Sequence, residues 1–402
     1  MKILAIETSC DDTGVAILRA SGSKFQVLSN IVSSQQIHAN YGGVFPIMAK
    51  REHQANLVPV LARALKLAKL LNHKLQITNY KQIPKSKLQI LKKILEKEST
   101  LFESTKKFLE TYEKPAVDYI AVTHGPGLEP CLWVGVNFAK ALSYAWSIPV
   151  IPVNHIEAHI LVNFLPKINE NHKSQITNHK IKFPAISLVV SGGHTQLILM
   201  KKIGKYEIIG ETRDDAAGEC FDKAARILGL GYPGGSIIAQ FAEQWKSQIT
   251  NHKSQIVLPR PMMHSKDYDF SFSGLKTAVL YKVRDEQLSP TVRTVGLNKK
   301  FIQEMCFAVQ DAICDVLIKK TLNAAKGYKA KTIILGGGVS ANGELRKQFK
   351  LQASGFKLQV PDPKLSTDNG LMIAVAGYFN RTKKIAWNRL SVHANLRIGN
   401  KD

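Results

Sequence analysis

Two successive runs of strand and helix patterns constrain the fold of this chain more than any other feature of its sequence. The first run contains five candidate strands, at residues 2–8, 14–20, 24–34, 117–123 and 149–153. The second run contains four, at residues 184–191, 195–201, 205–212 and 332–335. In each run three consecutive strands come first, and helices separate the later strands. This repetition predicts a duplicated α/β architecture of two lobes with a cleft between them.

We place the boundary between the lobes at residue 154, so that residues 1–154 form the first lobe and residues 155–402 the second. The small-residue helix after Gly370 is a candidate to pack back on the first lobe. A long amphipathic helix is expected from about Pro46 to Leu71, continued by a charged helical stretch that ends near Glu113. Further helices are expected at Cys131–Trp146 and from Asn342 onward.

A short phrase rich in Asn, His, Lys and Gln occurs three times, within the expected inserts near residues 72–113, 168–182 and 246–256. The copies have no apolar face, so we interpret them as insertions at surface loops, where added length costs little stability. Four histidines lie in the copies, at positions 73, 172, 179 and 252. We discount them as metal ligands because no acidic or cysteine side chain accompanies them.

The composition indicates a globular chain with a polyanionic partner. The chain has 402 residues, 45% of them hydrophobic, and a net charge of +24, which favours nucleic acid as a partner over a membrane. A lysine-rich cytosolic enzyme is the alternative. No apolar run approaches the roughly 20 residues of a membrane span, and no signal peptide is expected. The five cysteines form no C-x-x-C pair, so a cytoplasmic location is expected.

The segment from Asn154 to His159 carries a candidate metal site. His155 and His159 are four residues apart, so on a helix they share one face and can bind one transition-metal ion. An ordinary pair of surface or core histidines is the alternative. Glu157 stands two residues after the first histidine, whereas the H-E-x-x-H motif of metalloproteases has its glutamate one residue after. The shift turns Glu157 by roughly 100° and argues against a protease.

Asp368 precedes the small-residue helix and has two possible roles. It could simply cap that helix. If the two lobes fold face to face, it could instead supply a carboxylate as the third ligand beside the two histidines. Two histidines and one carboxylate leave open positions on a metal for a substrate.

Two glycine loops follow buried strands of the second half, at Ser191–Thr195 and Gly336–Asn342. Glycines let the backbone approach a ligand, and the helix after the second loop presents free N–H groups to an anion. Neither loop matches a Walker A or a G-x-G-x-x-G motif, and each alone is a common tight turn. Together they favour a pocket for a nucleotide or an acyl phosphate.

Two further segments carry polar groups. The turn from Glu7 to Gly14 holds Thr, Ser and Asp side chains that suit a phosphate and its metal, or that form an ordinary polar turn. Asp222 could hold a ribose or an amine. Its alternative is a surface ion pair with Lys223 or Arg226.

Taken together, these motifs resemble one family, the tRNA N6-adenosine threonylcarbamoyltransferases, formerly called O-sialoglycoprotein endopeptidases. The matching blocks run through nearly the whole chain outside the inserts: Ile6–Asp12, Ala49–His53, Gly125–Leu128, His155–His159, Ser191–Thr195, Phe221–Lys223, Tyr232–Gly235, Phe272–Lys276, Gly337–Asn342 and Ser366–Gly370. So many blocks in order are far more specific than any single motif.

The resemblance implies a two-lobed fold of the actin/Hsp70/sugar-kinase type. It implies transfer of a threonylcarbamoyl group from threonylcarbamoyl-AMP to the exocyclic amine of adenosine at tRNA position 37, in tRNAs that read codons beginning with adenine. It also implies protein partners, which in bacteria are a small inactive homologue and a P-loop ATPase and in archaea a kinase-containing complex. No membrane is implied.

The resemblance also implies site residues. A divalent ion, Fe²⁺ in most members and Zn²⁺ as the alternative, would bind His155, His159 and Asp368. The implied substrate-binding positions are Val189, Val190, Ser191, Gly192, Gly193, Asp222, Gly235 and Asn342. No side chain is an obvious general base, and the candidates are Glu7, Asp11 and His194.

The chain departs from the family pattern at two places. Glu129-Pro130-Cys131 replaces a stretch that usually contains Gly-Ser, and Lys50 replaces a common serine. Two rival functions are open: a metalloprotease, and a nucleotide-dependent chaperone or regulatory ATPase of the same fold. The ATPase would need Mg²⁺ but no ion bound by two histidines and an aspartate.

Overall fold

The structure is a computed structural model that describes residues 1–22, 24–74, 83–165, 181–248, 254–288 and 297–399. The chain forms two compact units with one five-stranded sheet each. The described residues of unit 1 come from Met1–Gln36, Val44–Lys180 and Asp368–Asn400, and those of unit 2 from Ile37–Gly43 and Ile181–Thr367. This division differs from the expected one at residue 154, because the helix after Asn154 and the last helix pack together in unit 1.

The strands of unit 1 are β1 (Lys2–Glu7), β2 (Asp12–Ser21), β3 (Lys24–Ser34), β4 (Tyr119–Gly125) and β5 (Val150–Asn154). They lie in the order β3-β2-β1-β4-β5. The first three form an antiparallel meander, and β4 and β5 run parallel to β1. Parallel neighbours need a crossover connection, which the helices supply. The five strands expected here from the sequence are confirmed.

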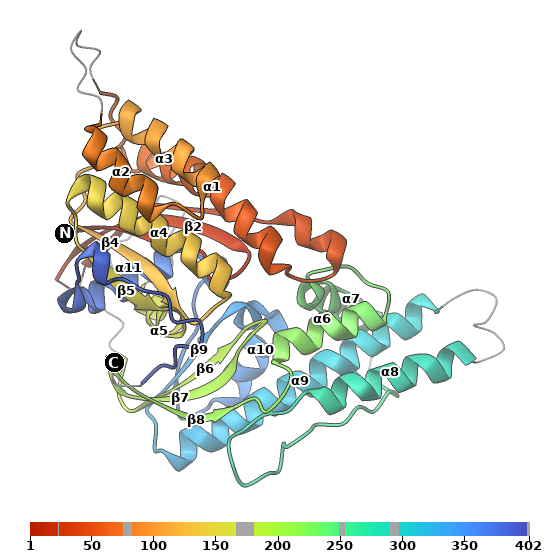
Figure 1. Cartoon of the computed structure of the whole chain (residues 1–402). Helices are drawn as coiled ribbons and strands as arrows, with labels where there is room; N and C mark the ends of the chain where they lie inside the picture. Colours follow the sequence, from red (N-terminus) through yellow and green to blue (C-terminus); the bar gives the residue numbers. More distant parts are fainter. Residues whose placement is uncertain (23, 75–82, 166–180, 249–253, 289–296, 400–402) are drawn as a thin grey trace. The chain divides into compact units, whose positions relative to one another are not determined.

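The helices of unit 1 are α1 (Pro46–Leu67), α2 (Lys85–Ile94), α3 (Ser99–Thr111), α4 (Glu129–Trp146), α5 (His155–Leu161) and α11 (Gly370–Phe379). Helices α1 and α4 cover one face of the sheet, and α11 covers the other (Figure 1). Leu4 and Ile6 of β1 belong to the core beneath α1 and α4, while Ile3 lies beneath Gly377 of α11. Because both faces are covered, β1 is apolar from Ile3 to Ile6 without alternation.

The prediction that the helix from Pro46 continues through the first insert is wrong after Leu67. The chain leaves α1 after Leu67, and Lys69 adopts a positive φ of 57° while Leu70 N donates to Leu65 O. This left-handed residue ends the helix. Within the described residues that follow, α2 packs on α4 and α3 on α1 as separate helices.

The strands of unit 2 are β6 (Ala185–Val190), β7 (Thr195–Lys202), β8 (Lys205–Glu211), β9 (Thr332–Gly336) and β10 (Lys357–Gln359). Their order is β10-β9-β6-β7-β8, with an antiparallel meander from β6 to β8 and parallel pairing of β9 with both β6 and β10. The four expected strands are confirmed. Strand β10 was missed because its three half-buried residues carry no periodic pattern.

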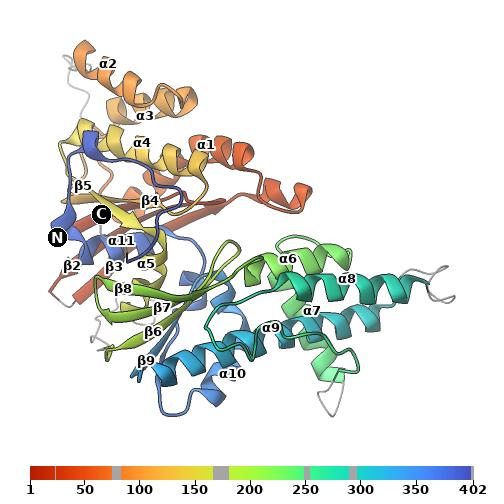
Figure 2. The ribbon, with the colours of Figure 1, turned by 60° about the horizontal axis from the view of Figure 1, so that its bottom comes forward.

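The helices of unit 2 are α6 (Ala217–Ile227), α7 (Gly234–Gln248), α8 (Ser273–Leu288), α9 (Lys299–Gly327) and α10 (Gly343–Gln352). Helices α6 to α9 pack together beside the sheet and share its apolar core (Figure 2). The short 3₁₀ helices of the chain are η1 (Gln36–Tyr41), η2 (Val162–Phe164), η3 (Gly338–Ala341), η4 (Pro363–Leu365), η5 (Arg381–Lys383) and η6 (Trp387–Arg389).

The two sheets have the same strand order and the same strand directions when each is traced outward from its first strand. Strand β6 corresponds to β1, β7 and β8 to β2 and β3, and β9 and β10 to β4 and β5. This is the duplicated α/β fold of the actin/Hsp70/sugar-kinase type, as expected.

The repeated phrase is only partly described. The copy at residues 171–180 lies outside the described residues, as do His172, His179 and His252. His73 forms a β-bridge to Tyr112, and their ring centroids are 4.7 Å apart. Among the described residues, none of the helices has the length and apolar character that crossing a bilayer requires.

Candidate functional site

Helix α5 begins directly after β5 and carries both histidines. The Asn154 side-chain oxygen accepts hydrogen bonds from the backbone N–H groups of Ile156 and Glu157, at 2.9 and 3.1 Å. This N-cap fixes the first turn of the helix. His155 and His159 therefore lie on one face, both buried, with their ring centroids 4.6 Å apart.

Asp368 reaches the same place from the far end of the chain. The residue that caps α11 is Asn369, whose side chain accepts from Met372 N, so Asp368 does not serve as the cap. Helix α11 starts against β2: a Cβ at Gly370 would lie 2.5 Å from Ala16 N. Only glycine allows this close approach, which brings Asp368 to the carboxyl ends of the strands of unit 1.

The three side chains converge on one point. Asp368 Oδ1 lies 3.1 Å from His159 Nε2 and 3.5 Å from His155 Nε2, and the two Nε2 atoms are 3.2 Å apart. These separations match neighbouring ligands around one ion with bonds of about 2.1 Å. The group is therefore compatible with a metal ion. All three residues belong to unit 1, so the return of α11, rather than the expected meeting of two lobes, supplies the carboxylate.

Glu7 holds the ring of His155 from behind. Its carboxylate is fully buried and lies 3.2 Å from His155 Nδ1, and it accepts hydrogen bonds from Ser9 N and from the Thr123 hydroxyl. A carboxylate on one ring nitrogen keeps the proton there and turns the other nitrogen, Nε2, toward a metal. No sequence pattern indicates the role of Thr123.

The charges around the histidines also suit a cation. Burial lowers the pKa of both rings, but for His155 the carboxylates of Asp368 and Glu7 outweigh burial and raise its pKa to about 9. For His159 burial prevails, and its pKa is lowered. The buried Nδ1 of His159 has no hydrogen-bond partner among the described residues. Two nitrogens facing one carboxylate thus form a donor set that fits a divalent ion.

The turn between β1 and β2 is held by residues from two of the family-like blocks. His53 of α1 contacts the Thr13 hydroxyl at 2.8 Å through Nδ1 and the Cys10 carbonyl at 2.9 Å through Nε2. Leu128 N donates to Ser9 O, and a Cβ at Gly127 would lie 2.7 Å from the same oxygen. These blocks therefore position the turn that carries Glu7. His53 belongs to the Ala49–His53 block, but no sequence pattern indicates its role.

The two departures from the family pattern have structural explanations. Pro130 lies in the first turn of α4, where its missing N–H leaves no intrahelical bond unmade. Lys50 Nζ lies 3.8 Å from a carboxylate oxygen of Glu98, a buried residue at the start of α3 that also accepts from Asn137. The lysine therefore compensates for a buried charge contributed by the insert.

In unit 2, the two glycine loops lie at the same edge of the sheet. Val189 of β6 pairs in register with Gly336 of β9, so the segments after both strands emerge together. Gly337 has a positive φ of 83°, and a Cβ there would lie 2.4 Å from Val190 O. Gly192 and Gly193 are exposed, with nothing within 4 Å of a Cβ built on either. Their backbone is open to a ligand.

The remaining substrate-binding candidates lie on neighbouring helices of unit 2. Asp222 Oδ1 accepts a hydrogen bond from Gly234 N at 2.8 Å, at the start of α7 next to Gly235. Asn342 caps α10 by accepting from Leu345 N, and its amide donates to Gln310. The side chains of Val189 and Val190 are buried in the core. These residues therefore support the glycine loops at least as much as they offer side chains to a ligand.

The sequence matches the family model for tRNA N6-adenosine threonylcarbamoyltransferase over residues 26–78 and 101–375. The enzyme of that name from Thermomicrobium roseum is 39% identical over 99% of this chain and 97% of its own length. Those from Persephonella marina and Syntrophomonas wolfei are 40% and 41% identical over 94% of this chain, and over 90% and 92% of their own lengths. The chain belongs to this family.

Membership makes the protein a transferase that modifies adenosine in tRNA at N6, with tRNA as a substrate. Among solved structures, component A of (R)-2-hydroxyglutaryl-CoA dehydratase from Acidaminococcus fermentans is similar, with a TM-score of 0.46 and 11% identity over 96% of this chain and 100% of that chain. The strand orders of the two sheets give the fold assignment.

The two rival functions are not favoured. Glu157 accepts a hydrogen bond from Asn380 at 2.7 Å, at the end of α11, so its carboxylate is used to join α5 to α11. A protease would need this group as a base on metal-bound water. The relatives of this threonylcarbamoyltransferase carry the transferase name and not that of a protease, chaperone or ATPase.

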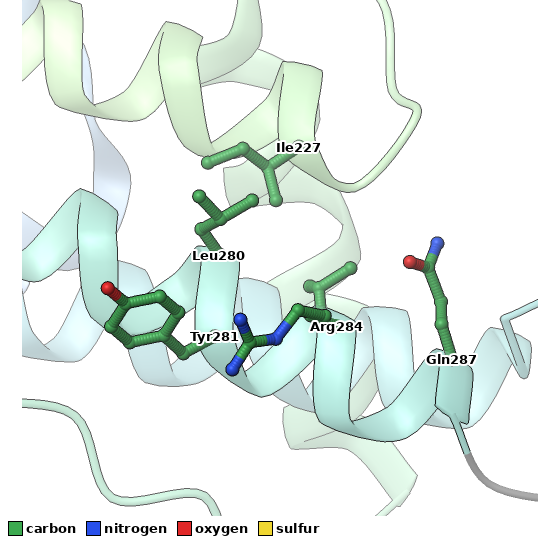
Figure 3. Close-up of a pocket in the computed structure, with 6 residues that line it drawn as sticks. Ile227, Leu280, Tyr281, Arg284 and Gln287 are labelled. Carbon is green, nitrogen blue, oxygen red and sulfur yellow. The ribbon is translucent and has the colours of Figure 1, made fainter.

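A pocket of about 270 Å³ lies elsewhere in unit 2, at α6 and α8. It is lined by Ile227, Leu280, Tyr281, Val283, Arg284 and Gln287 (Figure 3). The Arg284 guanidinium lies 5.0 Å from the centre of the Tyr281 ring. None of the candidate site residues lines this pocket, so it is separate from the candidate site.

Proposed function

We propose that this transferase moves the threonylcarbamoyl group from threonylcarbamoyl-AMP to N6 of adenosine 37, in tRNAs that read codons beginning with adenine. Family membership and the convergence of His155, His159 and Asp368 within 4.8 Å support the proposal. In the reaction, N6 forms a bond to the carbamoyl carbon, the bond from that carbon to the AMP phosphate oxygen breaks, and N6 loses a proton. AMP is the leaving group.

We propose Fe²⁺ as the metal, with Zn²⁺ as the alternative, held by the two histidine Nε2 atoms and the Asp368 carboxylate. Bound there, the ion would supply Lewis-acid stabilisation of negative charge on a phosphate or carbonyl oxygen. Glu7 would orient His155. Since both Glu7 oxygens already accept hydrogen bonds, its part is to position the ligand and not to remove a proton from the substrate.

The loops of unit 2 are proposed to bind the adenylate. Gly192 and Gly193 present open backbone next to Ser191. The second loop contains η3, and α10 follows it with N–H groups that suit an anion. Asp222 and Gly235 would shape the pocket, and Asn342 would fix the start of α10. Holding donor and acceptor together can supply several kcal/mol of the barrier to an amine attack.

With Glu7 assigned to positioning, Asp11 and His194 remain the candidates for the general base. Asp11 lies in the β1–β2 turn and accepts a hydrogen bond from the Cys10 thiol. Burial, followed by the charge of Asp11, raises the pKa of that thiol well above its usual range, so Cys10 stays protonated and is no nucleophile. A small inactive homologue and a P-loop ATPase are the proposed protein partners, and the cytoplasm is the proposed location.

The test is to incubate the metal-loaded protein with tRNA, threonylcarbamoyl-AMP and the candidate partners, and to digest the tRNA for mass spectrometry. The expected product is threonylcarbamoyladenosine at position 37. A His155→Ala variant, tested in parallel, should yield none. Failure of the loaded parent protein with every partner combination would overturn the proposal.

A further inference from the structure

Positively charged side chains gather at the edge of the unit 1 sheet where β1, β4 and β5 begin and β2 ends, opposite the metal centre. A pocket of about 350 Å³ opens there, lined by Met1, Lys2, Arg19 and the segment from Lys114 to Asp118. Lys2, Arg19 and Lys114 contribute three positive side chains, against the single carboxylate of Asp118. Such a pocket suits an anionic group such as a phosphate.

A second group of lysines lies next to the segment that leads to Lys114. Lys74 N donates to Thr111 O at 3.1 Å, and Glu113 N donates to Asn72 O at 3.0 Å. Burial lowers the pKa of Lys87, and the positive charges of Lys74 and Lys114 lower it further. Lys87 Nζ donates to Ala145 O at 2.6 Å and lies 5.8 Å from the centre of the Tyr144 ring. The cation is thus held in place over an aromatic ring.

The segment after α11 brings more of the same chemistry to this edge. Ile385 forms two backbone hydrogen bonds with Val150, at the start of β5. The neighbouring Lys384 Nζ lies 5.7 Å from the centre of the Tyr119 ring, at the start of β4. The Trp387 ring lies 5.3 Å from the Tyr144 ring, and both rings are half-buried.

We call this surface the basic edge and define it by the following residues: Lys2, Arg19, Lys87, Lys114, Tyr119, Tyr144, Lys384 and Trp387. Within the described part of the chain, no carboxylate forms an ion pair with Lys87, Lys114 or Lys384. Lys87, Lys384 and Trp387 also lie outside the two segments that match the family model.

We propose that the basic edge is a docking surface for the sugar-phosphate backbone of the tRNA. Lysine and arginine side chains interleaved with aromatic rings provide phosphate contacts together with stacking surfaces. Strand β4 has seven residues, so the basic edge lies about 20 Å from the metal centre. It would contact phosphates of the tRNA away from the reacting adenosine. The inference rests on tRNA being the acceptor of the proposed reaction.

The test compares two triple charge reversals that change the net charge equally. Arg19→Glu/Lys114→Glu/Lys384→Glu alters the basic edge, and Lys202→Glu/Lys205→Glu/Lys266→Glu alters exposed lysines of unit 2. Affinity for tRNA is measured at several salt concentrations. The edge variant should bind at least about 10-fold more weakly, with a salt slope lower by about two to three, while the control changes little.

Equal weakening of both triple variants, or parental affinity in the edge variant, would overturn the inference. Parental metal content and thermal unfolding show that the edge variant is folded. If it is not, the single Lys384→Glu variant replaces it, with an expected loss of about threefold and a slope lower by about one.

Two further measurements distinguish a failure of the proposed function from a failure of the docking surface. If the parent protein makes no modified nucleoside, the proposed function has failed. If the parent works and the edge variant binds tRNA normally, only the docking surface has failed. Binding to phosphatidylserine vesicles is measured alongside, and loss of vesicle binding with unchanged tRNA binding would assign the edge to a membrane surface and overturn the proposal.

Discussion

The carboxyl edges of the two sheets use one scaffold for opposite purposes. In both units a glycine after the fourth strand packs where the first strand ends: Gly127 meets Ser9, just after β1, and Gly337 meets Val190, the last residue of β6. Unit 1 fills this edge with buried ionisable groups, among them Glu7 and the two histidines. Unit 2 leaves exposed glycine backbone. The same topology thus carries a candidate cation site in one unit and an open backbone loop in the other.

The largest expected effect tests whether the edge of unit 1 is a metal site. Asp368→Ala removes one of three ligands, so metal content should fall below about a tenth of the parental value and transfer by at least about 100-fold. Metal analysis of the purified variant checks this. The matched control is Glu157→Gln, which should keep its metal because Glu157 contacts Asn380. A fully loaded Asp368→Ala protein would remove the distinction between the two edges.

Glu7→Gln tests whether Glu7 orients the ligand His155. The glutamine amide can keep only some of the contacts to Ser9 and Thr123, and it holds the proton on His155 Nδ1 less firmly. Metal affinity should fall by about 10- to 100-fold, as for other groups that orient a ligand histidine. Competition with a chelator measures it, and Glu98→Gln is the control because Glu98 is a buried glutamate of unit 1 with no contact to the ligands. Unchanged affinity in Glu7→Gln would contradict the role of Glu7.

Two alanine substitutions sharpen the account of unit 2. Gly337→Ala forces a side chain into a left-handed backbone and against Val190 O, and should lower the free energy of unfolding by about 2 kcal/mol or more. Gly192→Ala meets open space, so stability should change by less than about 0.5 kcal/mol while donor binding weakens about tenfold. Denaturant titration and calorimetry with a donor analogue measure the two effects. Similar losses of stability in both would show that the Gly192 loop is a packed turn.

The smallest effect concerns the crowding of carboxylates in unit 1. Burial, together with the charges of Asp368, Asp11 and Glu7, raises the pKa of Asp12 from 3.8 to about 7, against the opposing hydrogen bond from Ser34. The folded state thus holds this proton more tightly than the unfolded state. Stability should therefore be highest below pH 4 in this respect and decline as the pH rises toward 7.

The Asp12→Asn variant should abolish that decline in the metal-free protein. The full shift corresponds to roughly 4 kcal/mol, but Asp12 is partly exposed, so we expect a difference of about 1 to 2 kcal/mol between parent and variant at pH 8. Urea unfolding in the presence of a chelator, from pH 4 to 8, measures it. If the free energy of unfolding depends on pH in the same way in both proteins, the carboxylate of Asp12 does not destabilise the folded state.

Strand positions were predictable because both sheets bury apolar segments whose ends are marked by polar or glycine turns. Among the strands of the described residues, nine follow this pattern, and the three-residue β10 does not, since its length gives no period to detect. The helical insert was harder. Lysine-rich sequence is compatible with one long helix or several, and packing of α2 on α4 and of α3 on α1 decided the outcome.

Spacing and resemblance together predict the three candidate metal ligands. They do not predict the residues that hold those ligands in place. The partnership of Glu7 with Thr123 and His155 joins residues more than a hundred positions apart, and no local pattern encodes it. No local pattern predicts the ion pair of Lys50 with Glu98 either, because it forms only when α3 packs on α1.

By itself the sequence determined the duplicated strand pattern, the family and the chemical types gathered in each motif, because periodicity and turn residues act locally along the chain. Only the tertiary structure decided that Asp368 joins the histidines within one unit and that lysines from the insert and from the segment after α11 share an edge with Lys114. Those outcomes depend on close backbone approaches such as that of Gly370 to β2, which are set by packing between segments remote in sequence.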